Sequence, residues 1–234
     1  MKPLPIALSL PHAGLDTPPE VRHLSLLSPE DIQKDGDEGS RDMAMRLCPY
    51  VGDFSEATVA RAFVDLNRKE GDLSRDGIVK THTCWDVPIY NKPLPPGVID
   101  TLITTWHRPY HARLSQFARQ PALRLALDLH TMAEKAPPIS EDAGTRRPRL
   151  CLGNAHHSAS PKAWIETLAE LAARYVDPEV HINTPFSGGW ITRCHGREMP
   201  WIQVEVSREP WVSWEEKGEA ILELMQRFAE VIHL

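Results

Sequence analysis

Apolar residues recur along the chain with two different periods. Short apolar and β-branched runs predict strands at residues 6–10, 58–66, 123–129, 150–152, 180–183 and 201–206. Apolar residues three and four positions apart predict helices from 37 or 39 to 47, and at 97–118, 160–175 and 214–232. Ser160 and Pro161 suit the N-cap and first position of the third helix. Strands that alternate with amphipathic helices predict an α/β sheet covered on both faces.

Two long stretches show no periodicity. Residues 68–96 and 131–149 hold many Pro, Gly and charged side chains. Loops of this length in an α/β fold typically either form a site or are disordered. In open α/β sheets the chemistry lies at the carboxyl ends of the strands. No repeat or long linker divides the chain, so residues 1–234 are interpreted as one domain.

Composition narrows the class of protein. The 234 residues are 41% hydrophobic and 25% charged, with a formal net charge of −6. These values exclude a wholly disordered, collagen-like or coiled-coil chain, and the absence of a long basic run argues against nucleic acid as the main partner. No apolar run approaches the roughly 18–20 residues that span a bilayer. Residues 1–10 are too short and too Pro-rich for a signal peptide. We therefore expect a soluble, cytoplasmic protein without a membrane or nucleic-acid partner.

The cysteines form no metal-binding motif. Cys48, Cys84, Cys151 and Cys194 are far apart, and no CxxC pair occurs. This spacing argues against a structural zinc site built from cysteines and against a disulfide. We expect all four to be small buried apolar side chains.

Two predicted strands are followed by histidines. His12 comes after the run 6–10, and His130 comes directly after the run 123–129. Asp128 lies on the same side of its strand as His130 and can accept its second ring N–H, which leaves the other nitrogen for a metal. A histidine at a strand end is also commonly structural, and an Asp–His hydrogen bond also occurs without a metal. The residues alone leave both interpretations open.

Carboxylates supply two further candidates. Asp37 and Glu38 lie in a turn flanked by glycines. Asp37 could cap the following helix, or complete a His/carboxylate/His zinc set with a position open for water. Glu205 interrupts the apolar strand at 201–206, where a charge is costly unless it is paired or functional. Because burial raises the pKa of a carboxyl group, Glu205 is a candidate general base.

A pair of polar residues follows the run 58–66. The guanidinium of Arg68 beside the amide of Asn67 suits the bidentate capture of a substrate carboxylate. An arginine at a strand end is also commonly a surface ion pair.

Seven short motifs together resemble the N-formylglutamate amidohydrolase (N-formylglutamate deformylase) family. They are PHAG at 11–14, DEG at 37–39, VDLNR at 64–68, RPYHARL at 108–114, DLHTM at 128–132, NTPFSGGWITRCHG at 183–196 and QVEVSR at 203–208. Their order and spacing are specific, although each motif is short. The resemblance implies a three-layer α/β/α fold with a central mixed sheet. It also implies kinship with zinc carboxypeptidases and aspartoacylase-type deacylases, with a zinc site at the strand ends.

The resemblance also assigns the reacting groups. It implies His12, His130 and an acidic third residue as zinc ligands; we place the third at Asp37, with Glu38 as the fallback. Zinc suits these ligands, and manganese, iron and cobalt also accept them. Glu205 matches the carboxylate that activates the attacking water.

The substrate site follows from the same resemblance. Asn67 and Arg68 match a pair that clamps a substrate carboxylate. The segment NTPFSGG is expected to enclose the substrate, with Gly188 and Gly189 allowing close backbone approach and Arg193 beyond them. Another motif supplies Arg108 and His111, which either line the site or have a structural role on a helix face.

The leading hypothesis is a zinc-dependent amidohydrolase that cleaves a small N-acyl amino acid, with N-formyl-L-glutamate as the expected substrate. One alternative is a zinc carboxypeptidase or peptidoglycan-type amidase on the same fold. Two others are a binding protein that has lost catalysis and a metal-independent domain whose histidines are structural.

Overall fold

A mixed six-stranded sheet organises the chain in the order β2-β1-β3-β6-β4-β5. The computed structural model describes residues 3–234, so Met1 and Lys2 of the N-terminal segment lie outside the described residues. β1, β2, β3 and β6 run parallel, while β4 pairs antiparallel with β6 and parallel with β5. The strands are β1 (Leu4–Leu10), β2 (Val51–Glu56), β3 (Leu125–Met132), β4 (Leu150–Gly153), β5 (Val180–Ile182) and β6 (Trp201–Ser207).

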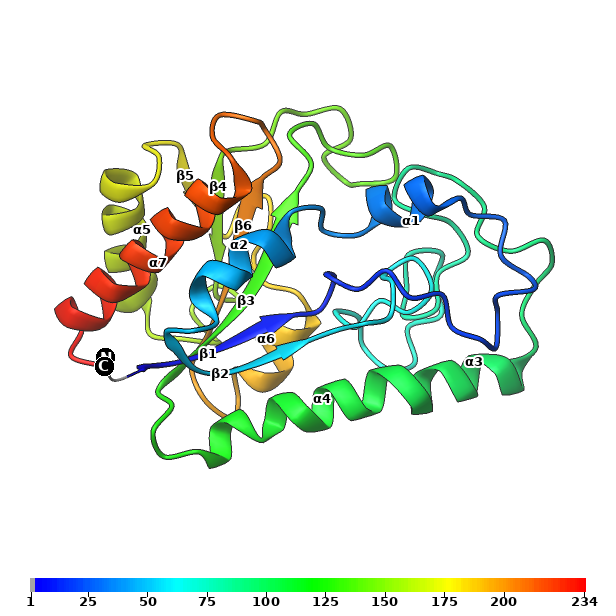
Figure 1. The fold of residues 1–234 in the computed structure, drawn as a ribbon, viewed down its shortest axis with the longest axis horizontal. Helices are drawn as coiled ribbons and strands as arrows, with labels where there is room; N and C mark the ends of the chain where they lie inside the picture. Colours follow the sequence, from blue (N-terminus) through cyan, green and yellow to red (C-terminus); the bar gives the residue numbers. More distant parts are fainter. Residues whose placement is uncertain (1–2) are drawn as a thin grey trace.

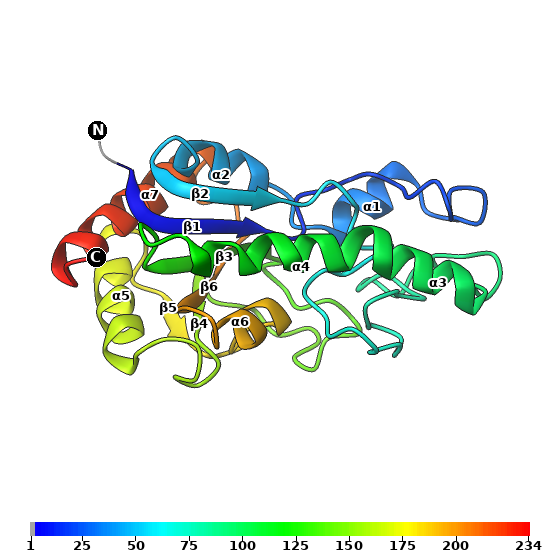
Figure 2. The same cartoon turned by 90° about the horizontal axis from the view of Figure 1, so that it is seen from below.

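Helices cover both faces of this sheet. On one face lie α2 (Ser40–Leu47), α5 (Lys162–Tyr175) and α7 (Trp214–Val231). On the other face lie α6 (Trp190–His195) and a long rod made of α3 (Pro96–Leu102), a π-helical turn (Ile103–His107) and α4 (Arg108–Ser115). The rod crosses the sheet in Figures 1 and 2, and α1 (Pro29–Asp35) lies beyond the end of β1. The predicted three-layer α/β/α fold with a mixed sheet is confirmed.

Alternation along the central strands separates apolar from polar side chains. Leu125, Leu127 and Leu129 of β3 face the core under α2, α5 and α7. Asp128 and His130 of the same strand therefore point to the opposite face, as do Gln203 and Glu205 of β6. His130 and Glu205 are neighbours in the β3–β6 register. Polar side chains thus gather on one face near the carboxyl ends of two adjacent strands.

Most elements match the periodicity of the sequence. The strands at 6–10, 150–152, 180–183 and 201–206 and the helices at 97–118 and 214–232 are present, with ends shifted by a few residues. The stretches 68–95 and 133–149 contain no helix and only isolated bridges. β3 begins later and ends later than predicted, so His130 lies within the strand.

The predicted strand at 58–66 is wrong. Residues 61–63 form a turn, and Phe63 and Val64 are fully buried against the long rod. Their apolar, β-branched character reflects burial of an irregular segment, which among the described residues pairs only through an isolated bridge between Val59 and Asp16. The edge strand is instead β2, which reads Val-Gly-Asp-Phe-Ser-Glu and is buried at few positions. An edge strand with this sequence carries little hydrophobic signal.

Two predicted helix starts need correction. Asp37 does not cap α2; Gly39 occupies the N-cap position with a φ of 79°. Pro161, rather than Ser160, is the N-cap of α5, and no side chain caps this helix. The Ser160 hydroxyl instead accepts a hydrogen bond from Asn154. The sequence also gave no prediction of α1, which has a complete capping box between Ser28 and Asp31, or of α6.

The cysteine prediction holds only in part. All four cysteines are free, but only Cys151 is buried, while the others are half-buried. Among residues 3–234 no helix has the length and hydrophobicity needed to cross a membrane.

Candidate active site

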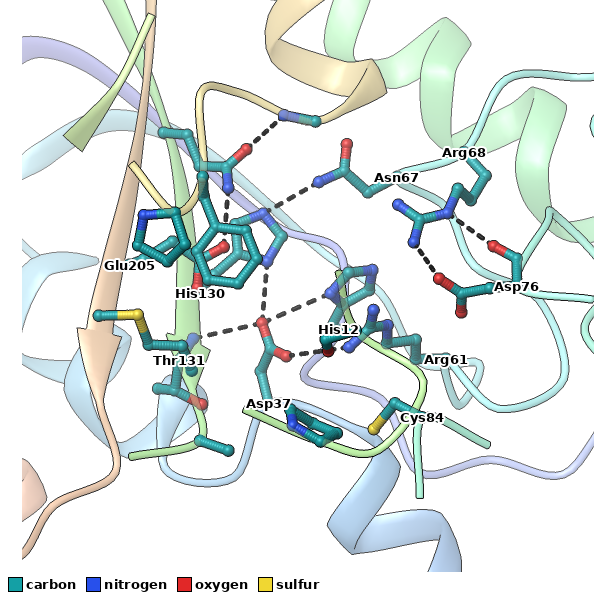
Figure 3. Close-up of a pocket in the computed structure, with 18 of the residues that line it drawn as sticks. His12, Asp37, Arg61, Asn67, Arg68, Asp76, Cys84, His130, Thr131 and Glu205 are labelled. Carbon is teal, nitrogen blue, oxygen red and sulfur yellow. Dashed lines mark hydrogen bonds and ion pairs between the residues drawn. The ribbon is translucent and has the colours of Figure 1, made fainter. Parts of the chain in front are cut away.

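Two imidazole rings and a carboxylate converge at the carboxyl ends of β1 and β3. The chain turns after β1 and presents His12, while His130 projects from β3 itself. Their ring centroids are 4.9 Å apart, and Asp37 lies between them (Figure 3). Asp37 Oδ2 is 3.4 Å from His12 Nδ1 and 2.8 Å from His130 Nδ1. One donor atom from each residue lies within 4.8 Å of the other two, which is the spacing of a metal site.

The donor set fits a zinc ion. Two imidazoles and one carboxylate are a common ligand set of catalytic zinc, which keeps a fourth position for water or substrate. His12 Nδ1 is buried and has no hydrogen-bond partner among the described residues, although a buried polar atom normally has one. A cation between the rings would satisfy this nitrogen.

The far nitrogen of each ring is held by a buried carboxylate. His12 Nε2 lies 2.9 Å from Asp65 Oδ1, and His130 Nε2 lies 3.0 Å from Asp128 Oδ2. Because a carboxylate accepts the N–H at Nε2, Nδ1 is the nitrogen of each ring that remains for a cation, which would replace any proton there. Burial alone would lower the pKa of His130, but Asp128 and Glu205 outweigh it and hold that pKa well above its usual value.

Asp37, rather than Glu38, faces the two rings. Asp37 is buried and also accepts a hydrogen bond from the backbone N–H of Thr131, whereas Glu38 is exposed. Burial would raise the pKa of Asp37, but His12 and His130 hold it well below its usual range. Asp37 is therefore an ionised, fixed acceptor.

Glu205 lies beside the rings and is aligned by a neighbour on its own strand. Its side chain is 6% exposed, and no described ion pair includes it. Gln203 Nε2 donates to Glu205 Oε1 at 2.7 Å, while Gln203 Oε1 accepts the backbone N–H of Gly189. Burial raises the pKa of Glu205, and the positive His130 opposes that rise. The result is a fixed carboxylate with an elevated pKa, as a general base requires.

Asn67 connects the histidines to the glycine turn before α6. Its Oδ1 accepts the backbone N–H of Ile191 at 2.8 Å, and its Nδ2 lies 3.3 Å from His130 Nε2. A Cβ at Gly189 would lie 2.2 Å from Asn67 Nδ2, so only glycine fits there. Gly188 has a φ of 122°, which also favours glycine. The backbone of Gly189 thus closely approaches the side chain of Asn67.

The predicted substrate-binding arginines lie farther out. Both Arg68 and Arg193 line a cavity of about 790 Å³ that also reaches His12, His130 and Glu205. Asp76 binds Arg68 through its backbone oxygen and its carboxylate (Figure 3), whereas exposed Arg193 donates a hydrogen bond to the hydroxyl of Ser187.

The sequence left the roles of Arg108 and His111 undecided, and neither residue lines the cavity. Exposed Arg108 pairs with Glu70, and His111 lies on the inner face of α4.

Several site residues escaped the sequence analysis. Asp65 lay inside a motif but had no assigned role, and Arg61 was assigned to a strand. Arg61 and Arg208 approach Asp37 Oδ1 at 4.0 and 3.6 Å. Only their neighbourhood in space reveals them, since a lone arginine carries no sequence signal.

Comparison with known proteins agrees with this geometry. A sequence model of the N-formylglutamate amidohydrolase family matches residues 4–211. The chain belongs to the N-formylglutamate amidohydrolase family. The match covers each residue of the site, from His12 to Arg208, and confirms the resemblance carried by the motifs.

Individual relatives of this family are distant in sequence and close in fold. An N-formylglutamate deformylase of Pseudomonas putida is 24% identical in an alignment of 228 positions that covers 89% of this chain and 82% of the relative. The N-formylglutamate amidohydrolase of Ralstonia eutropha JMP134 superimposes with a TM-score of 0.80 at 19% identity, covering 100% of this chain and 95% of that one. A gene product of Agrobacterium tumefaciens gives 0.75 at 15% identity, covering 98% and 92%. These solved structures share the α/β fold described above.

Proposed function

We propose that the protein is a zinc-dependent amidohydrolase that hydrolyses an N-acyl amino acid, with N-formyl-L-glutamate as substrate and glutamate and formate as products. The observation that carries the proposal is the convergence of His12, Asp37 and His130 beside Glu205 in one cavity. Family membership and the names of the relatives support the same reaction class.

The metal would be held by His12, Asp37 and His130. Bound zinc polarises a substrate carbonyl and makes water a nucleophile near neutral pH. Asp65 and Asp128 keep the two imidazoles in the orientation that ligation requires.

Glu205 acts as the proton carrier. As general base it accepts a proton from the attacking water and then delivers that proton to the nitrogen of the departing amine. Its raised pKa favours the first step, because a carboxylate whose pKa lies above its ordinary value takes up a proton more readily. The amide of Gln203 fixes one carboxylate oxygen, so the other is free to face the water.

Arg68 receives the carboxylate of the amino acid. Its contacts with Asp76 use Nε and Nη2, so Nη1 has no described partner. Arg68 and its neighbour Asn67 both line the cavity (Figure 3). Arg193 on the rim supplies a second positive charge for a dicarboxylic substrate.

The direct test joins metal analysis to a substrate screen. Purified protein is assayed for bound metals, then with N-formyl, N-acetyl and N-succinyl amino acids, before and after chelation and zinc addition. We expect about one zinc per chain and hydrolysis of N-formyl-L-glutamate that chelation abolishes. Release of a terminal amino acid from peptides, with no action on N-formyl amino acids, would instead identify a carboxypeptidase.

A further inference from the structure

Two histidines of the long rod bind the backbone on either side of Asn67. His111 Nε2 lies 2.9 Å from the carbonyl oxygen of Leu66, and His107 Nε2 lies 2.9 Å from that of Arg68. The two rings are one helical turn apart and lie against each other with centroids 4.2 Å apart. They thus hold the peptide unit that precedes Asn67 and the one that follows Arg68.

A break in the regular helix includes His107 and precedes His111. Residues Ile103–His107 form a π turn, closed by the N–H of Arg108 bonding to the carbonyl of Ile103. Pro109 follows and has no N–H for a regular helical bond, which accounts for a wider turn at this point. Turns of this kind are frequent at functional sites.

The hydrogen-bond partners of His111 show which of its ring nitrogens carries the hydrogen. A carbonyl oxygen can only accept, so His111 Nε2 carries the hydrogen that binds Leu66. Burial lowers the pKa of His111 to about 3, with the neighbouring His107 contributing, so the ring is neutral and its Nδ1 is an acceptor. His195 Nε2 lies 2.8 Å from this nitrogen and therefore donates to it.

This second bond of His111 reaches α6. His195 is the last residue of α6 and is 2% exposed, and its Nδ1 lies 3.1 Å from Glu198 Oε2. The start of α6 is held independently, since Asn67 Oδ1 accepts the N–H of Ile191. Hence α6 is tied to the Leu66–Arg68 segment at both of its ends, once directly and once through His111.

We infer that His111, with His107, is a positioning residue that fixes Asn67 and Arg68 relative to α6 for capture of the substrate carboxylate. We call the two rings the histidine staple. The inference rests on the proposed function, because it assumes that Arg68 receives that carboxylate. Neither ring lines the cavity, so the staple acts through the backbone of residues 66–68.

A small movement of the histidine staple would affect both substrate binding and catalysis. A displacement of about 1 Å in a substrate-positioning group can cost about 100-fold in rate. The turn at Gly189 abuts Asn67 and donates through its N–H to Gln203, which in turn binds Glu205. Movement of the segment around Asn67 would therefore disturb carboxylate binding first and the general base second.

The test compares variants on one helix. His111→Phe keeps a ring but removes both hydrogen bonds, and His107→Leu removes only the bond to Arg68. Leu114→Ala is the matched control, because Leu114 lies on the same helix α4 as the half-buried His111 and belongs to the apolar core. Each variant is measured for melting temperature, zinc content, amide hydrogen exchange of a peptide spanning 64–70, and kcat and KM. Kinetics use N-formyl-L-glutamate and its α-carboxamide.

We expect His111→Phe to retain zinc, to speed exchange in residues 64–70, and to reduce the kcat/KM preference for the free carboxylate about 10- to 100-fold. Leu114→Ala should lower the melting temperature and leave that preference intact. If His111→Phe does not fold, His107→Leu tests the inference in its place, and we expect a smaller fall in the same kcat/KM preference. Unchanged exchange and preference in the folded variant would overturn the inference. A wild-type protein that shows no preference for the free carboxylate would overturn the proposed function instead, and the exchange measurement then decides the staple.

Discussion

Replacement of Glu205 by glutamine separates the chemical role of this residue from a structural one. The change keeps the shape of the side chain and removes its charge and its ability to take a proton. A glutamine oxygen can still accept the bond from Gln203 that now ends on Glu205 at 2.7 Å. No described salt bridge includes Glu205, and His130, whose raised pKa Glu205 supports, keeps Asp128 and Asp37 as partners in the variant.

The expected loss is therefore one of rate. Removal of a positioned general base typically costs about 10²–10⁴ in rate, which corresponds to about 3–5 kcal/mol of transition-state stabilisation. We expect kcat to fall by this factor while zinc content stays near that of the wild type. The exposed neighbour of the metal site, Glu38, offers a matched control, since Glu38→Gln should change neither kcat nor zinc content.

Stability gives an independent readout of the same variant. Burial raises the pKa of Glu205 above its value in the unfolded chain, so the folded state binds this proton more tightly. The resulting stability is complete below the unfolded pKa and is lost as pH rises through the folded pKa. In metal-free protein, Glu205→Gln should thus melt at or above the wild-type temperature, increasingly so at higher pH. A folded, zinc-loaded variant with wild-type kcat would refute the proposed role.

Three further predictions concern neighbouring groups. Arg68→Lys should raise KM for a carboxylate substrate about 10- to 100-fold with zinc content unchanged, because a hydrogen bond to a charged group contributes about 1.5–3 kcal/mol; steady-state kinetics that match the wild type would remove this arginine from the site. Asp37→Asn should weaken zinc binding in a competition titration, whereas an equal loss in Glu38→Gln would reassign the ligand. Asp35→Asn should cost about 3–5 kcal/mol in denaturant unfolding, because it removes the nearer carboxylate of the fully buried Lys80 and leaves that ammonium with Asp76 at 3.5 Å. Burial would raise the pKa of Asp35, but the charge of Lys80 outweighs burial and lowers that pKa. The stability that ionised Asp35 contributes is therefore present above pH 3.8 and is lost as pH falls through the folded pKa. An acid titration of stability that is the same in Asp35→Asn as in the wild type would contradict this.

Chemistry at strand ends was predictable because parallel strands bring their carboxyl ends together. His12, His130 and Glu205 each adjoin or interrupt an apolar run, and that contrast is visible in one dimension. The choice between Asp37 and Glu38 was not predictable, because both lie in one turn and only the packing of that turn shows which side chain points inward.

The sequence left the role of His111 open for a different reason, because this residue works through backbone contacts. His111 looks like any histidine on an amphipathic helix, and its partners lie 45 and 84 positions away. Likewise, the apolar run at 58–66 signalled burial, which an irregular segment packed under a helix satisfies as well as a strand does. The hydrophobic pattern of a segment indicates how much of it is buried, whereas its backbone hydrogen bonds determine whether it is a strand, a helix or irregular.

The measurement that tests the central claim most directly is the zinc-edge X-ray absorption spectrum of the zinc-loaded protein, beside those of His12→Ala and Asp37→Asn. The account predicts about one zinc per chain, with nitrogen and oxygen neighbours at about 2.0–2.2 Å and two imidazoles among them. His12→Ala should lose one imidazole signal and most of its zinc. A spectrum with sulfur ligands at about 2.3 Å, or one that neither substitution alters, would contradict the claim that His12, Asp37 and His130 hold the catalytic metal.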